Sequence, residues 1–125
     1  MRKICITAGK VNATAVLNES PTADAVWKAL PIEARVNTWG EEIYFAVPVH
    51  QSEESGAKAE VDRGNLAYWP PGNAFCIFFG RTPASRGDQI RAASAVNVFG
   101  QIEGDAGVFK GIADGTPVRV TSEPE

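Results

Sequence analysis

The strongest constraint on the fold is the apolar segment Leu66–Gly80, which reads LAYWPPGNAFCIFFG. Pro70 and Pro71 lie in its middle, and a proline cannot donate a hydrogen bond to a neighbouring strand. The segment therefore predicts two strands, Leu66–Trp69 and Ala74–Phe79, with a turn between them. Because both strands are apolar on both faces, we expect a helix and neighbouring loops to cover the outer side as well.

The rest of the chain alternates short apolar runs with glycines and prolines, which indicates mostly β structure. Further strands are expected at Lys3–Ile6, Val11–Leu17, Ser94–Ile102 and Thr116–Thr121, and a hairpin is expected from Ile32–Thr38 and Ile43–Val49. In that hairpin, alternation directs Glu33, Arg35, Glu42 and Tyr44 toward solvent. We expect a solvated polar loop at His50–Glu60 and an irregular polar segment at Gly80–Ala93.

Two segments predict helices. In the first, Ser20 is a suitable cap, Pro21 fits the first helical position, and apolar residues follow at helical spacing up to Leu30. The second runs over Asp105–Ala113, with Asp105 as its cap. Together these elements predict a single domain over residues 1–125: a mainly β fold, with a closed barrel of about eight mostly antiparallel strands and two helices.

Composition excludes several function classes. The net charge is −3 and the isoelectric point is about 5.2, which argues against nucleic acid as a partner. No apolar run approaches the roughly 20 residues that cross a bilayer, and the N-terminus lacks the apolar stretch of a signal peptide. We therefore expect a cytoplasmic protein without a membrane partner.

The chain has two cysteines, Cys5 and Cys76, and one histidine, His50. Apolar or β-branched neighbours favour two buried, reduced thiols over a disulfide or a nucleophile. Two cysteines and one distant histidine do not form a zinc ligand set. Since no P-loop, dinucleotide or catalytic-triad pattern is present, we expect no cofactor and no metal.

Three segments carry a resemblance to a known family: WGEEIYF at Trp39–Phe45, the apolar segment extended to Pro83, and NVFGQI at Asn97–Ile102. With the order of elements, they resemble the cyclophilins, the barrel-type prolyl isomerases. The closer similarity is to small bacterial and archaeal cyclophilin-like proteins of unassigned function. The resemblance covers nearly the whole chain and implies the cyclophilin barrel.

The same resemblance shows where the isomerase groups differ. Cyclophilins carry an arginine that polarises the prolyl amide, followed by a strand that contains glutamine; here Arg35 is the only candidate, and no glutamine follows it. Arg91 and Val96 occupy the places of a tryptophan and a histidine, and the phenylalanine of the proline pocket would fall on the Cys76/Phe78 face. The resemblance thus implies an inherited frame that lacks most isomerase groups.

Each candidate site residue also has a structural interpretation. Arg35 with Tyr44 and Phe78 would form a reduced isomerase site, but a surface pair with Glu33 or Glu42 is the commoner role of such an arginine. Trp39 and Tyr68–Trp69 would line a groove or, more commonly, pack in the core. The arginines at 81, 86 and 91 would bind an anion or belong to a solvated loop that also holds Asp88.

From these residues we predict a binding protein with a groove on its outer face. The predicted groove consists of Trp39, Glu42, Tyr44, Phe78, Arg81, Thr82 and Arg91. Its ligand would be a peptide segment or a small anionic molecule. One alternative is a weak peptidyl-prolyl isomerase that uses Arg35 as its catalytic residue, and another is a structural partner, such as a homodimer formed through the aromatic surface.

Overall fold

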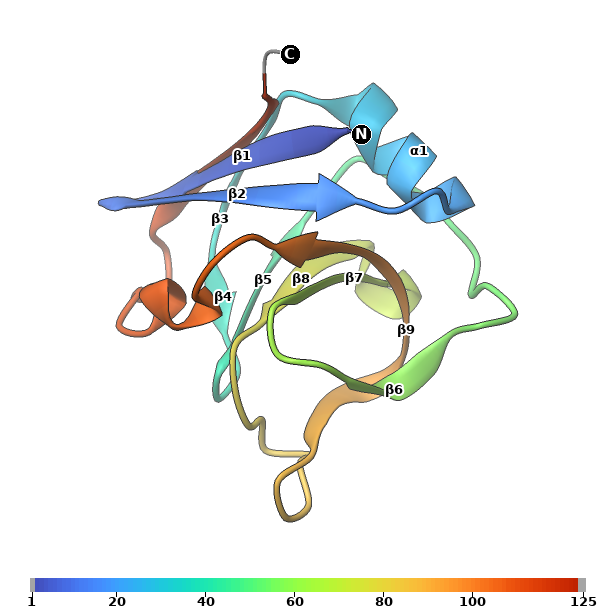
Figure 1. The fold of residues 1–125 in the computed structure, drawn as a ribbon, viewed down its shortest axis with the longest axis vertical. Coiled ribbons are helices and arrows are strands. Elements are labelled where there is room, and N and C mark those ends of the chain that lie inside the picture. Colours follow the sequence, from blue (N-terminus) through green and yellow to red (C-terminus); the bar gives the residue numbers. More distant parts are fainter. Residues whose placement is uncertain (1, 124–125) are drawn as a thin grey trace.

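An antiparallel sheet of ten strands curls around a hydrophobic core (Figure 1). The computed structural model describes residues 2–123. The strands are β1 (Lys3–Ala8), β2 (Val11–Leu17), β3 (Ile32–Arg35), β4 (Asn37–Thr38), β5 (Glu42–Ala46), β6 (Lys58–Val61), β7 (Asn65–Trp69), β8 (Ala74–Phe78), β9 (Ile90–Ile102) and β10 (Pro117–Ser122). The mainly β class predicted from the sequence is confirmed.

The order of strands shows how the sheet curls. It runs β3-β10-β1-β2-β9-β7-β8-β5-β4, and β6 pairs with β9 beside this path. Its two end strands, β3 and β4, are consecutive along the chain, with only Val36 between them. In residues 2–123 no hydrogen-bonded ladder joins β3 to β4, so the chain itself, and not a backbone ladder, connects the two edges of the sheet.

The predicted hairpin is wrong in its first half. β3 pairs with β10, where Ala34 lies opposite Val118, and only the two residues of β4 pair with β5. Val36 separates the two short strands, and its side chain is 1% exposed. The alternation of apolar and polar residues over this segment belongs to two short strands that pair with different partners, and not to one strand of a hairpin.

Two segments form strands although their polar sequence predicted loops. β6 lies at the end of the predicted loop and pairs with the first half of β9. β9 begins at Ile90, not at Ser94, so the predicted irregular segment ends four residues early. Both stretches carry exposed polar side chains, such as Lys58 and Arg91, because one of their faces meets solvent.

One α-helix is present in the described part of the chain: α1, Pro21–Ala29. Its predicted start is confirmed, since the Ala23 N–H donates to Ser20 Oγ at 3.1 Å. The predicted second helix is wrong. Only a 3₁₀ turn, η2 (Ala106–Phe109), forms there, and Gly111, with a φ of +87°, follows it in the left-handed conformation.

None of the helices found between residues 2 and 123 has both the length and the apolar character needed to cross a membrane. The other short helix is the 3₁₀ turn η1 (Pro70–Gly72), which joins β7 to β8 where the two prolines predicted a turn.

Two hydrophobic clusters cover opposite faces of β7 and β8. The main core lies inside the curl, where the Phe45 and Phe75 rings stack with centroids 4.8 Å apart. The second cluster lies on the other side, which we call the outer face; it comprises Val61, Ala67, Ala74, Cys76, Phe78, Ala92 and Val96. The prediction that both faces are covered is confirmed, but β6 and the first half of β9 form the outer cover in place of a helix.

A buried polar network ties the segment before β6 to α1 and β9. The Glu54 side chain accepts hydrogen bonds from the backbone N–H and hydroxyl of Thr22, and the Glu54 N–H donates to Asn97 Oδ1 at 2.8 Å. The Asn97 amide also donates to the Ser52 carbonyl at 2.9 Å. Glu54 thus caps the start of α1, so the prediction that this loop is merely solvated is wrong at Glu54.

Candidate functional site

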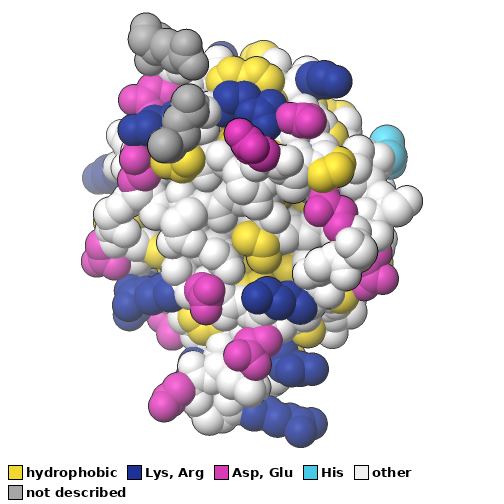
Figure 2. Space-filling view, turned by 45° about the vertical axis from the view of Figure 1, so that its right-hand side comes forward, with side chains coloured by type: hydrophobic (Ala, Val, Ile, Leu, Met, Phe, Trp, Pro, Cys, Tyr) yellow, Lys and Arg dark blue, Asp and Glu magenta, His cyan; other side chains and the backbone are white. Residues whose placement is uncertain are grey.

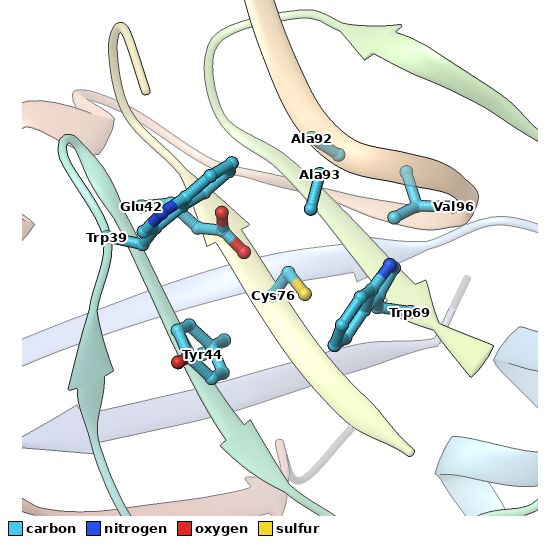
Figure 3. Close-up of a pocket in the computed structure, with 8 residues that line it drawn as sticks. All are labelled: Trp39, Glu42, Tyr44, Trp69, Cys76, Ala92, Ala93 and Val96. Atoms are coloured by element: carbon cyan, nitrogen blue, oxygen red, sulfur yellow. The ribbon is translucent and has the colours of Figure 1, made fainter. Parts of the chain in front are cut away.

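A pocket of about 230 Å³ opens on the outer face of the sheet (Figure 3). Strands β5, β7, β8 and β9 and the turn before β5 contribute its walls. The lining side chains are Trp39, Glu42, Tyr44, Trp69, Cys76, Ala92, Ala93 and Val96. We call this the Glu42 pocket.

The pairing of β5 with β8 places the polar groups of the pocket on one face. Tyr44 lies opposite Cys76, and Glu42 lies opposite Phe78. Residues directly opposite each other point to the same side of a sheet, and so do residues two apart on one strand. All four side chains therefore point outward. Phe78 is fully buried in the outer cluster and does not line the pocket.

The turn Trp39–Glu41 positions the first aromatic wall. The Trp39 N–H donates to the Glu42 carbonyl at 2.9 Å, and the Glu41 N–H donates to the Arg81 carbonyl at 2.8 Å. Gly40 has a φ of +62°, and a Cβ there would lie 2.9 Å from the Arg81 oxygen. Only glycine fits this turn without strain, and the turn holds the Trp39 ring over the pocket.

Trp69, at the end of β7, forms the wall opposite Trp39. Its indole N–H donates to Ser94 Oγ at 2.7 Å, which fixes the ring against β9. Figure 3 shows the rings of Trp39, Tyr44 and Trp69 arranged around the Glu42 carboxyl and the Cys76 sulfur. All three aromatic residues are half-buried, so each ring keeps a surface that a ligand can contact.

Glu42 is the one charged side chain among residues 2–123 that is buried, with 5% exposed. It takes part in none of the ion pairs found in that range. Burial raises the pKa of Glu42 to about 7, and the nearby Cys76 thiol offsets this slightly. The prediction that Glu42 points toward solvent is wrong, because β9 and the aromatic rings cover this part of the outer face.

Cys76 forms the floor of the pocket and is 2% exposed. Burial raises the pKa of its thiol well above the usual value, and the neighbouring Glu42 raises it further. An unionised thiol is a poor nucleophile, so the structure favours a packing role for Cys76. Both cysteines are free, as predicted; Cys5, however, is half-buried and not fully buried.

The structure separates the predicted groove residues into two groups. Trp39, Glu42 and Tyr44 line the pocket, while Phe78, Arg81, Thr82 and Arg91 do not. Thr82 is 6% exposed and organises the loop before β9: its hydroxyl donates to the Arg91 carbonyl, and its N–H donates to Ser85 Oγ at 2.9 Å.

Arg81 lies near the start of this loop, and Arg91, which is also exposed, is the second residue of β9. Figure 2 shows basic and acidic side chains close together at the projecting lower end of the molecule, where the loop lies, and no continuous basic patch on that face.

Arg35 lies on β3, outside the pocket lining. Its Nη1 donates to the Gly115 carbonyl at 2.9 Å. The surface pair considered from the sequence is formed by a different arginine, since Glu33 accepts from Arg119 at 3.0 Å. Arg35 thus fastens the start of β10 and is not directed at the Glu42 pocket.

Five residues that line the pocket are missing from the predicted groove: Trp69, Cys76, Ala92, Ala93 and Val96. Trp69 had been considered together with Tyr68, but Tyr68 is fully buried on the core side and only Trp69 faces outward. Ala92 and Ala93 precede Ser94, the expected start of that strand, whereas Val96 lies within the expected strand but was not assigned to the groove. Strand alternation in the apolar segment was a usable signal for Trp69, since it separates these neighbouring aromatic residues onto opposite faces.

Within residues 2–123, no three histidine, cysteine, aspartate or glutamate side chains come together as a possible metal-ligand set. The chemistry available to the pocket is therefore that of one carboxyl group, one thiol, one phenol and two indoles.

Comparisons with known proteins agree with the fold. A family model described as cyclophilin-like matches residues 2–121. A solved structure, the solution structure of a hypothetical protein from Archaeoglobus fulgidus, is 42% identical, with 96% of this chain and 93% of that chain covered and a TM-score of 0.80. None of the curated proteins matches this chain.

Proposed function

Because the chain belongs to the cyclophilin-like family, we propose that it is a binding protein that holds a small ligand, or one side chain of a peptide, in the Glu42 pocket. The observation that carries this proposal is the aromatic enclosure around a buried carboxyl. Apolar walls with a few convergent polar groups are typical of ligand sites.

The dimensions of the pocket limit the ligand. A volume of about 230 Å³ is slightly below the range of about 300–1,000 Å³ that drug-sized ligands occupy. One amino-acid side chain or a small metabolite fits this space. A longer peptide would insert one side chain and lie across the surrounding surface.

The pocket does not favour the anionic ligand that was predicted from the arginines. Arg81 and Arg91 lie outside the lining, and the acidic group inside it would repel an anion when ionised. A neutral or cationic ligand suits Glu42 better.

The isomerase alternative requires a cation at the prolyl amide next to an apolar pocket. Arg35, its only candidate, is bonded to Gly115 and does not line the Glu42 pocket. The interface alternative requires an exposed apolar surface, and Val108, at 45%, is the one large hydrophobic side chain that is exposed among the described residues. No specific observation in the described part of the chain therefore favours either alternative.

The three tryptophans provide a direct test. Trp39 and Trp69 line the pocket, while Trp27 lies on α1 beside Arg2, with the guanidinium 5.7 Å from its ring. In a ¹H–¹⁵N NMR titration with a library of small neutral, cationic and anionic compounds, a pocket ligand should shift the indole signals of Trp39 and Trp69 but not that of Trp27. A library without any compound that shifts the first two signals would contradict the proposal.

A further inference from the structure

Glu42 is a buried carboxyl that no cation of the described chain neutralises. Of the side chains that line the pocket with it, none is a lysine, arginine or histidine, and burial raises the pKa of the Cys76 thiol well above its usual value. An ionised carboxyl in such a place is strongly disfavoured unless a positive charge accompanies it. Since the pocket opens onto this group, a ligand is able to supply that charge.

The walls of the pocket suit a cation as well. The faces of aromatic rings carry partial negative charge and attract ammonium groups within about 6 Å of the ring centroid. Trp39, Tyr44 and Trp69 present three such rings around one carboxyl (Figure 3). Ala92 and Val96 complete the lining with apolar surface, which suits the alkyl part of a ligand.

We propose that the Glu42 pocket binds an alkylammonium ion, with the Glu42 carboxylate as counter-ion and the rings of Trp39, Tyr44 and Trp69 as walls. This inference rests on the proposed function above and names the chemical class of its ligand. A metal ion fits less well, because the described chain offers no set of three ligating side chains here.

The elements packed around Glu42 carry four other titratable groups: Tyr44 on β5, Cys76 on β8, Glu41 in the preceding turn and Arg91 on β9. Glu41 turns away and lies 3.6 Å from the Lys110 ammonium, and Arg91 is exposed and opposite Glu60. Only Tyr44 and Cys76 share the pocket. The charge inside the pocket is therefore set by Glu42.

Binding is consequently linked to a proton. Burial raises the pKa of Glu42 to about 7, whereas a bound cation favours the ionised form. The ligand should therefore expel up to one proton, and the full proton only at a pH below about 6. Since only the ionised fraction is competent, the affinity should be about tenfold higher at pH 8 than at pH 6.

The test compares choline with 3,3-dimethyl-1-butanol, which has the same shape but no charge. Binding is followed through the three indole signals in the wild-type protein, in Glu42→Gln and in the matched control Glu41→Gln, which changes a carboxyl outside the pocket. We expect choline to bind the wild type and Glu41→Gln at least tenfold more tightly than the alcohol. Glu42→Gln should lose this preference.

Two further outcomes separate this inference from the proposed function. Equal binding of choline and the alcohol, unaffected by Glu42→Gln, would overturn the cation inference and leave a ligand pocket. Tighter binding of butyrate would also overturn it. If neither these compounds nor the wider library shifts the Trp39 and Trp69 signals, both the inference and the proposed function fail.

The ammonium group has two possible sources, a small free ammonium compound and the side chain of a modified lysine in a peptide. A peptide that contains Nζ-trimethyllysine distinguishes them when it is titrated beside choline. Tighter binding of the peptide supports an alkylammonium site for a peptide ligand, and equal or tighter binding of choline supports a site for a small free ammonium compound.

Discussion

Glu42 and Cys76 lie diagonally across the pairing of β5 and β8, because Glu42 is opposite Phe78 and Cys76 is opposite Tyr44. Each group changes the ionisation of the other. The carboxyl raises the pKa of the thiol, while the thiol slightly lowers the pKa of the carboxyl. Because the pKa of Glu42 is about 7, the pair is mostly uncharged at pH values well below neutral.

Glu42 should make the stability of the protein depend on pH. Its pKa rises from about 4.5 to about 7 on folding, so between these values the folded state holds a proton that the unfolded state has lost. The contribution of Glu42 to the free energy of unfolding therefore falls as the pH rises through this window, and above pH 7 it no longer changes by much. A pKa shift of this size corresponds to a change of about 3 kcal/mol in the free energy of unfolding. Urea denaturation of the wild type and of Glu42→Gln at pH 4.5 and pH 7.5 measures this change.

The glutamine variant should lack this contribution, while Glu41→Gln should retain it. Identical pH dependence in the wild type and Glu42→Gln would show that the carboxyl is solvated in solution.

The two cysteines should differ in reactivity. Cys76 is 2% exposed and its thiol pKa is raised, whereas Cys5 is half-buried on β1. Because thiolates are the reactive form, iodoacetamide should modify Cys76 in the folded protein at least tenfold more slowly than Cys5. Mass spectrometry of the two peptides over time measures both rates. A faster reaction at Cys76 would indicate an activated thiol.

Prolyl isomerisation should not be accelerated by this protein. The only candidate arginine, Arg35, donates to Gly115 and does not line the pocket. We expect a prolyl-peptide assay at high protein concentration to give the uncatalysed rate for both the wild type and Arg35→Ala. Acceleration that disappears in Arg35→Ala would instead make Arg35 catalytic and contradict the proposed function.

Asn97 should be important for stability. It is 1% exposed, accepts from the Glu54 N–H and donates to the Ser52 carbonyl. Asn97→Ala leaves these groups without partners, which should lower the free energy of unfolding by about 2–3 kcal/mol. The exposed Asn12 provides a control: Asn12→Ala should cost less than about 1 kcal/mol. Equal losses in urea denaturation would contradict a structural role for the buried network.

Much of the fold was predictable because the strands of the core keep their alternation. The apolar segment gave β7 and β8 correctly, since two prolines exclude a continuous strand. β6 and the beginning of β9 were missed because their polar residues, such as Lys58 and Arg91, resemble those of a loop. A strand that covers an already folded sheet needs few apolar residues, so its sequence pattern is weak.

The candidate site was predictable only in part. Trp39, Glu42 and Tyr44 were named from the sequence, and the structure brings them together. The burial of Glu42 was not predictable from local sequence, because the segment that covers it lies on β9, about fifty residues further along the chain. The prediction of a second helix was wrong for a local reason: Gly107 and Gly111 lower the helix propensity of residues 105–113.

The short strands at the two edges of the sheet also bear on aggregation. An exposed edge offers unpaired backbone groups to which another chain can add a strand, as happens in amyloid fibres. Here one edge has four residues and the other has two, and Val36 links them directly. A foreign strand would find little backbone to pair with at either of these two edges, and edges this short disfavour growth into fibres.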